Sequence, residues 1–180
     1  MFRSLMFLMI SMTMVLSSCG GKKDKEAKDD EPGKDWSAKP LAATEGAIGA
    51  IKFTVDLPAG FKVDNQGDVN ISWRPDMDDY FSEPSVQVLL ASTPAKTPEE
   101  FVSNAMLDKN DEVIKSEKTA DGFLLEYATK NKGILRVSVQ KAAGEKALVC
   151  NASQAKQGGV PNFEATRAWL GKICGSLKLK

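Results

Sequence analysis

The sequence predicts an α+β domain, in which an antiparallel sheet of about six or seven strands carries a mid-chain helix and a C-terminal helix. Apolar and polar residues alternate with a period of two in several short segments between residues 51 and 152. The apolar period lengthens to that of a helix after Thr97 and again after Gly159. Residues 46–180, about 135 in all, fit the size of a single domain.

Four predicted strands precede the first helix. In the first, residues 51–57, Ile51, Phe53, Val55 and Leu57 alternate with more polar residues, and a Pro-Ala-Gly turn follows. The other three are predicted near residues 61–63, 69–73 and 86–90.

The mid-chain helix has a clear start signal. Thr97 is a suitable N-cap, Pro98 suits the first helical position, and Glu100 stands where a capping box requires an acidic residue. The predicted apolar face of this helix consists of Phe101, Val102, Ala105 and Met106.

A meander and a closing helix complete the predicted domain. Strands are expected near residues 113–114, 123–127, 134–140 and 147–152, with a tight-turn signal at Asn131-Lys132-Gly133. In the C-terminal helix, one side is expected to carry Phe163, Leu170, Cys174 and Leu177, flanked by Trp169 and Ile173.

Residues 1–18 have the layout of a bacterial export signal. Arg3 is the only charge before Lys22, and the stretch from Leu5 to Leu16 is almost entirely apolar. That stretch is shorter than the about 20 apolar residues that a membrane-spanning helix needs. The following Leu16-Ser17-Ser18-Cys19 resembles the lipobox of bacterial lipoproteins. The resemblance implies that the signal is removed and that Cys19 becomes a lipidated N-terminus held in the bilayer.

The residue after the lipobox bears on location. Gly20 stands where Asp would be the usual inner-membrane retention signal of enteric bacteria, so the resemblance implies an outer-membrane lipoprotein that faces the periplasm. An ordinary cleaved signal and an uncleaved anchor remain the alternatives. Residues 19–45 are expected to be the lipidated cysteine and a disordered tether, because the charged run 22–31 offers nothing to bury.

Cys150 and Cys174 are the remaining cysteines. An even pair in an oxidising compartment predicts a disulfide, which would join the last helix to the sheet. Two buried free thiols are the alternative.

Composition excludes several function classes. The chain has 24 basic and 24 acidic residues, which gives no electrostatic case for nucleic-acid binding, and it has no His. No catalytic, cofactor or metal site is predicted. The densest acidic run fails as a calcium loop because Phe81 and Gln87 stand where Gly and Glu are required. We instead interpret this loop as a possible recognition surface, made of Asp76, Asp78, Asp79, Tyr80 and Phe81.

The segment Phe53-Thr54-Val55-Asp56-Leu57-Pro58-Ala59-Gly60-Phe61 is similar to the start of the PsbP/Mog1-like fold and its bacterial lipoprotein relatives. That family is mostly non-enzymatic, and it supplies no catalytic residues. The leading hypothesis is therefore a membrane-anchored module that binds a protein partner or assists envelope assembly. The alternatives are a carrier of a small apolar or lipid ligand, held between sheet and helix, and a hydrolase that uses carboxylates.

Overall fold

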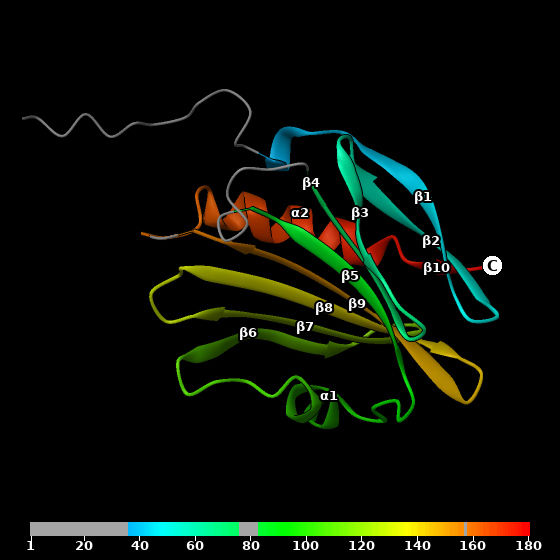
Figure 1. The fold of residues 1–180 in the computed structure, drawn as a ribbon. Helices are drawn as coiled ribbons and strands as arrows, with labels where there is room; N and C mark the ends of the chain where they lie inside the picture. Colours follow the sequence, from blue (N-terminus) through cyan, green and yellow to red (C-terminus); the bar gives the residue numbers. More distant parts are fainter. Residues whose placement is uncertain (1–35, 76–82, 157) are drawn as a thin grey trace, which may run out of the picture. The chain divides into compact units, whose positions relative to one another are not determined.

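The computed structural model describes residues 36–75, 83–156 and 158–180, and it has the α+β class (Figure 1). Ten strands form two antiparallel sheets, one of seven strands and one of three, and the described residues contain two α-helices. The helices lie on opposite faces of the larger sheet, with α2 (Phe163–Gly175) on one face and α1 (Pro98–Asn104) on the other (Figure 1).

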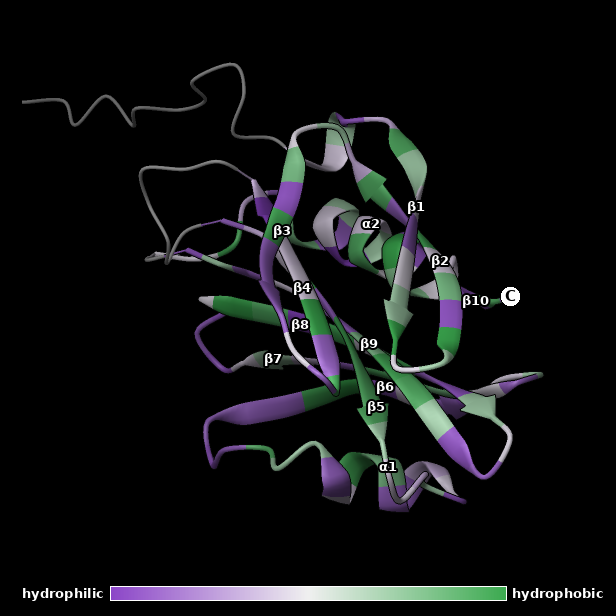
Figure 2. Ribbon diagram, turned by 45° about the vertical axis from the view of Figure 1, so that its right-hand side comes forward, coloured by the Kyte–Doolittle hydropathy of each residue, from purple (hydrophilic) through white to green (hydrophobic). Residues whose placement is uncertain are grey.

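The seven-stranded sheet has the strand order β3-β4-β5-β9-β8-β7-β6, and every neighbouring pair is antiparallel. Its central strands β5, β9 and β8 carry long hydrophobic stretches (Figure 2). The strands in spatial order are β3 (Phe61–Gln66), β4 (Asn70–Pro75), β5 (Ser85–Ala91), β9 (Lys146–Ala155), β8 (Ile134–Ala143), β7 (Gly122–Thr129) and β6 (Asp111–Lys118).

The period-two alternation of these strands builds a core on each face. On the α2 face, Leu135, Val137 and Val139 of β8 are buried together with Leu148 and Cys150 of β9. The helix covers them with Trp169, Leu170, Ile173 and Cys174. On the opposite face a smaller cluster lies beneath α1, consisting of Ala95, Phe101, Phe123, Leu125, Tyr127 and Val149.

The three-stranded sheet corrects the predicted boundary between tether and domain. It has the order β1-β2-β10, formed by β1 (Leu41–Ile48), β2 (Ile51–Pro58) and β10 (Lys178–Leu179). The sequence analysis assigned residues up to 45 to the tether, whereas β1 pairs with β2 along its whole length. The segment has no apolar alternation because it is an edge strand in which only Ile48 is buried.

Trp36 also belongs to the folded unit, in the short 3-10 helix Trp36–Ala38. Its indole Nε1 donates a hydrogen bond of 2.6 Å to the Glu83 carboxylate, and its ring packs edge-on against Phe61 with centroids 5.5 Å apart. The ammonium of Lys39 lies 3.7 Å from the indole centroid. These contacts fix the point at which the N-terminal segment enters the domain.

The two helices follow their sequence signals with local differences. Thr97 caps α1 by accepting a 3.2 Å hydrogen bond from the Glu100 amide, as predicted. Met106 leaves the predicted apolar face, because the helix ends at Asn104 and Met106 is 89% exposed with a φ of 49°. Leu177 is buried, although it lies beyond the end of α2.

We expect Gly122→Ala to lower the free energy of unfolding by about 2–3 kcal/mol, because a Cβ there would overlap the carbonyl oxygen of Gln140 on the neighbouring strand. Gly171→Ala is the matched control, since a Cβ on this helical glycine meets no atom within 4 Å. It should raise the free energy by about 0.5–1 kcal/mol. Urea unfolding of both variants measures these changes, and equal effects would contradict the close approach at Gly122.

Candidate functional site

Several predicted site residues lie outside the described part of the chain. These are Cys19 and the whole possible recognition loop, Asp76, Asp78, Asp79, Tyr80 and Phe81. Trp73, just before that loop, is 2% exposed and packs edge-on against Phe53 in the core. Glu83, just after it, is the residue that holds Trp36.

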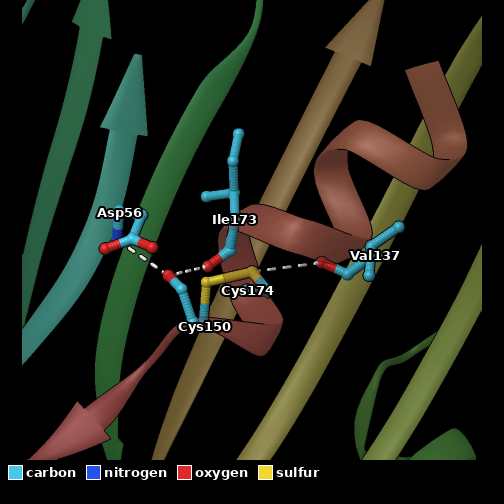
Figure 3. The surroundings of a disulfide bond; sticks show 6 residues. Asp56, Val137, Cys150, Ile173 and Cys174 are labelled. Atoms are coloured by element: carbon cyan, nitrogen blue, oxygen red, sulfur yellow. Dashed lines mark hydrogen bonds between the residues drawn. A yellow bond between two sulfur atoms is a disulfide. The ribbon is translucent and has the colours of Figure 1, made fainter. Parts of the chain in front are cut away.

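The structure contains the Cys150–Cys174 disulfide, which joins β9 to α2 (Figure 3). Both half-cystines are fully buried in the cluster beneath α2. Just past the helix end, the Ser176 hydroxyl donates to the Ile173 carbonyl at 2.6 Å and accepts from the Asp56 amide at 2.7 Å. The end of α2 is thus tied both to β9 and to β2 of the smaller sheet.

A groove of about 660 Å³ lies on the other face of the seven-stranded sheet. Its floor is formed by β5, β9, β8 and Tyr127 of β7, and the end of α1 lines one side of it. Because α1 covers only part of this face, the floor changes from apolar to polar along the strands. We call it the polar groove and define it by the polar floor residues Ser85, Gln87, Arg136, Ser138, Asn151 and Ser153.

One row of the polar groove crosses three adjacent strands. Gln87 of β5 pairs in register with Asn151 of β9, which pairs in turn with Ser138 of β8. Among the described residues, none of these three side chains has a hydrogen-bond partner. Ser138 is only 5% exposed. None of their side-chain polar atoms is both fully buried and unpartnered, so these groups open to the groove, where a ligand can bond to them.

The next row carries the charge of the polar groove. Ser85 and Ser153 face each other with their hydroxyls 2.9 Å apart, and Ser153 is in register with Arg136. Arg136 lies 3.7 Å from the carboxylate of Asp111, and its guanidinium carbon is 5.6 Å from the Tyr127 ring centroid. Among the described residues, Arg136 is the only charged side chain that lines the groove.

Gln140 holds the apolar end of the groove together. Its side-chain oxygen accepts from the Ala95 amide at 3.0 Å, and its nitrogen donates to the Ala95 carbonyl at 2.9 Å. This buried two-way bond fastens the segment before α1 to the sheet. The position of α1, and hence of the groove wall, is therefore set by β8.

Burial raises the pKa of the Tyr127 phenol, with a smaller opposing effect from Arg136. A raised pKa means that folding favours the protonated phenol, so this contribution to stability is complete below the unfolded-state pKa of about 10 and is lost as the pH rises through the folded-state pKa. Tyr80→Phe leaves Tyr127 as the sole tyrosine. We expect its phenolate absorbance to appear above pH 10 in the folded protein, and titration at or below the value for free tyrosine would contradict this.

A second, more apolar groove of about 420 Å³ runs along one flank of α2. Its floor includes Leu124 and Val139, and the helix presents Ala168, Gly171 and Gly175 to it. We call it the flank groove. At its rim the Lys141 ammonium lies 2.8 Å from the Asp121 carboxylate, and their hydrogen bond lowers the pKa of Asp121.

Two kinds of site are absent from the described residues. No group of three or more His, Cys, Asp or Glu side chains lies close enough together to hold a metal ion in this part of the chain. Within the same residues, no helix is long and apolar enough to cross a bilayer.

The sequence analysis missed the polar groove. Its residues occupy the alternate positions of strands that were correctly predicted, and such positions ordinarily face solvent. The only signal was the uncharged character of Ser138, Asn151 and Ser153, where an exposed strand face usually carries Lys or Glu.

No protein-family model matches the chain, and no curated protein matches it. A crystal structure of a protein from Bacteroides thetaiotaomicron VPI-5482 is similar to this chain, with a TM-score of 0.39 and 12% sequence identity. The similarity covers 71% of this chain and 45% of that one. This chain therefore spans less than half the length of that protein.

Proposed function

We propose that the protein is a non-enzymatic lipoprotein, anchored through acylated Cys19 in the outer membrane, whose periplasmic domain binds a protein partner in the polar groove. The lipobox-like Leu-Ser-Ser-Cys and the preceding signal layout support the anchor. The absence of His from the sequence supports a non-enzymatic role, because the commonest general base is missing. The observation that carries the binding role is the row of unpartnered polar side chains on the groove floor.

The arrangement of the domain suits a partner-binding surface. Trp36, where the N-terminal segment enters, packs in the cluster on the α2 face of the sheet, whereas the polar groove lies on the α1 face. Trp36 therefore packs away from the polar groove. The predicted recognition loop, including Tyr80 and Phe81, stays a second proposed contact surface.

Affinity capture of the full-length protein from native envelopes tests the binding role. Asn151→Trp would fill the polar groove, and Lys172→Trp, which places the same side chain in the flank groove on the other face of the sheet, is the matched control. We expect a protein partner that crosslinks to the wild type and to Lys172→Trp but not to Asn151→Trp, with circular dichroism confirming that both variants fold. Undiminished capture by Asn151→Trp would contradict binding in this groove.

The anchor has a separate test. Metabolic labelling with radioactive palmitate should label the wild type, and Cys19→Ala should abolish both the label and recovery in the membrane fraction. Label that persists in Cys19→Ala would contradict acylation at this position.

The flank groove favours a second candidate function, the carrier of a small apolar or lipid ligand. Its floor of Leu124 and Val139 and its small-residue wall offer an apolar surface between sheet and helix. Lipid that copurifies with the wild type and is lost in Gly171→Leu, with the protein partner retained, would support this function. The absence of bound lipid from the wild type would contradict it.

A further inference from the structure

We infer that the partner places a short polypeptide segment that carries a carboxylate in the polar groove. The peptide groups of the segment bond to the row Gln87–Asn151–Ser138, and its carboxylate binds Arg136. This inference rests on the proposed function, and it specifies the chemistry of the partner at that site. No part of it depends on the loop that contains Tyr80.

The first support is the hydroxyl of Ser138. This residue lines the groove, is 5% exposed, and has no side-chain hydrogen-bond partner among the described residues. Its Oγ is not one of the fully buried polar atoms that lack a partner, so the hydroxyl opens into the groove. A ligand in the groove can therefore bond to it without any rearrangement of the sheet.

The second support is the kind of groups that the row presents. Gln87 and Asn151 lie side by side on adjacent strands, and each carboxamide offers both a donor and an acceptor. Peptide groups also present one donor and one acceptor each, so an extended chain matches this row group by group. Three neighbouring strands give the row a width of roughly 10 Å, the span of about three residues.

The aromatic residues of the groove favour a peptide over a glycan. Sugar rings bind by stacking on exposed aromatic faces, whereas Phe101 and Tyr127, the aromatic residues of the lining in the described part of the chain, are 5% and 8% exposed. The exposed apolar group at the groove edge is Met106, at 89%. A flexible thioether adapts to apolar side chains of varied shape, as a peptide supplies.

Arg136 determines the expected charge of the segment. It is the only charged side chain in the lining within residues 36–75, 83–156 and 158–180, and it is 37% exposed. Its Nη1 forms an ion pair with the Asp111 carboxylate at 3.7 Å, and the same carboxylate oxygen accepts from the Asp108 amide at 3.0 Å. The guanidinium has five N–H donors, so this pair leaves others that fit a carboxylate from a ligand.

The test begins with a phage-displayed library of random linear peptides, selected on the full-length wild-type protein. Enriched peptides should carry an Asp or Glu. A labelled synthetic copy should bind with a Kd at least about tenfold lower than the same peptide with that residue changed to Asn or Gln. Enrichment of peptides without acidic residues, or no enrichment at all, would overturn the inference.

Variants of the groove separate binding from folding. Arg136→Gln should weaken the peptide at least about tenfold. Ser138→Ala should weaken it several-fold and leave Tm within about 2 °C of the wild type, because the hydroxyl has no partner in the described part of the protein. Ser116→Ala, an exposed serine of β6, is the control and should change neither binding nor Tm. A Ser138→Ala protein that folds and binds the peptide normally would overturn the assignment.

The outcomes distinguish this inference from the proposed function. If a protein partner is captured through the polar groove but the peptides bind equally well to Arg136→Gln, the proposed binding function is supported. The inference that the bound segment carries a carboxylate is then wrong. Binding of chitotetraose, an N-acetylglucosamine oligomer, that Ser138→Ala weakens would instead assign the groove to a glycan and overturn the peptide.

Discussion

Replacing Phe53 with alanine is expected to lower the free energy of unfolding by about 3–5 kcal/mol. The ring is fully buried in β2 of the smaller sheet and packs edge-on against Trp73 of the larger sheet, with centroids 6.4 Å apart. It also covers Gly46, whose Cβ position would lie 2.5 Å from the ring. Removing the ring therefore opens a cavity where the two sheets meet.

Chemical unfolding monitored by circular dichroism measures this loss. Leu179→Ala is the matched control, because Leu179 pairs with Phe53 in register but is 38% exposed. It should cost less than about 1 kcal/mol. A cost at Phe53 no greater than at Leu179 would contradict the buried contact between the sheets.

Removing the Cys150–Cys174 disulfide with alanine at both positions is expected to cost about 3 kcal/mol. The two residues are 24 apart in the sequence, and their link restricts the unfolded chain over that loop. The bond also holds α2 on β9 next to the contact between Ser176 and Asp56. We therefore expect hydrogen exchange to rise first in the C-terminal half of α2.

Reduction supplies an independent comparison for the same prediction. Wild type unfolded in the presence of dithiothreitol should match the double alanine variant, and dithiothreitol should not alter the variant. Equal stability of oxidised wild type and the variant would contradict a stabilising bond. Free thiols at Cys150 and Cys174 in the unfolded, unreduced protein would contradict the bond itself.

Much of the larger sheet and both helices could be predicted because each has a local cause. In residues 134–140 and 147–152, apolar and polar residues alternate because one face of each strand is buried. The start of α1 is marked by the hydrogen bond that the Thr97 side chain accepts. The strand Leu41–Ile48 has no local sequence signal of this kind. It is an edge strand of small and polar residues, and its partner β2 determines its conformation.

The candidate site could not be predicted for a related reason. Ser138 and Asn151 occupy the non-core phase of their strands, and the sequence does not show how much of that face α1 covers. Arg136 resembles an ordinary exposed strand cation until the register brings it beside Ser153. The proposed binding depends on which rows α1 leaves uncovered, and that follows from the tertiary position of this seven-residue helix.

Photo-crosslinking in native envelopes tests most directly whether a protein binds in the polar groove. The probe is a benzophenone side chain at Asn104, which lines this groove. The same probe at Lys172, which lines the flank groove on the other face, is the control. The binding account predicts one protein adduct from Asn104 that is absent from Lys172. A lipid adduct from Lys172 with no protein adduct from Asn104 would contradict it.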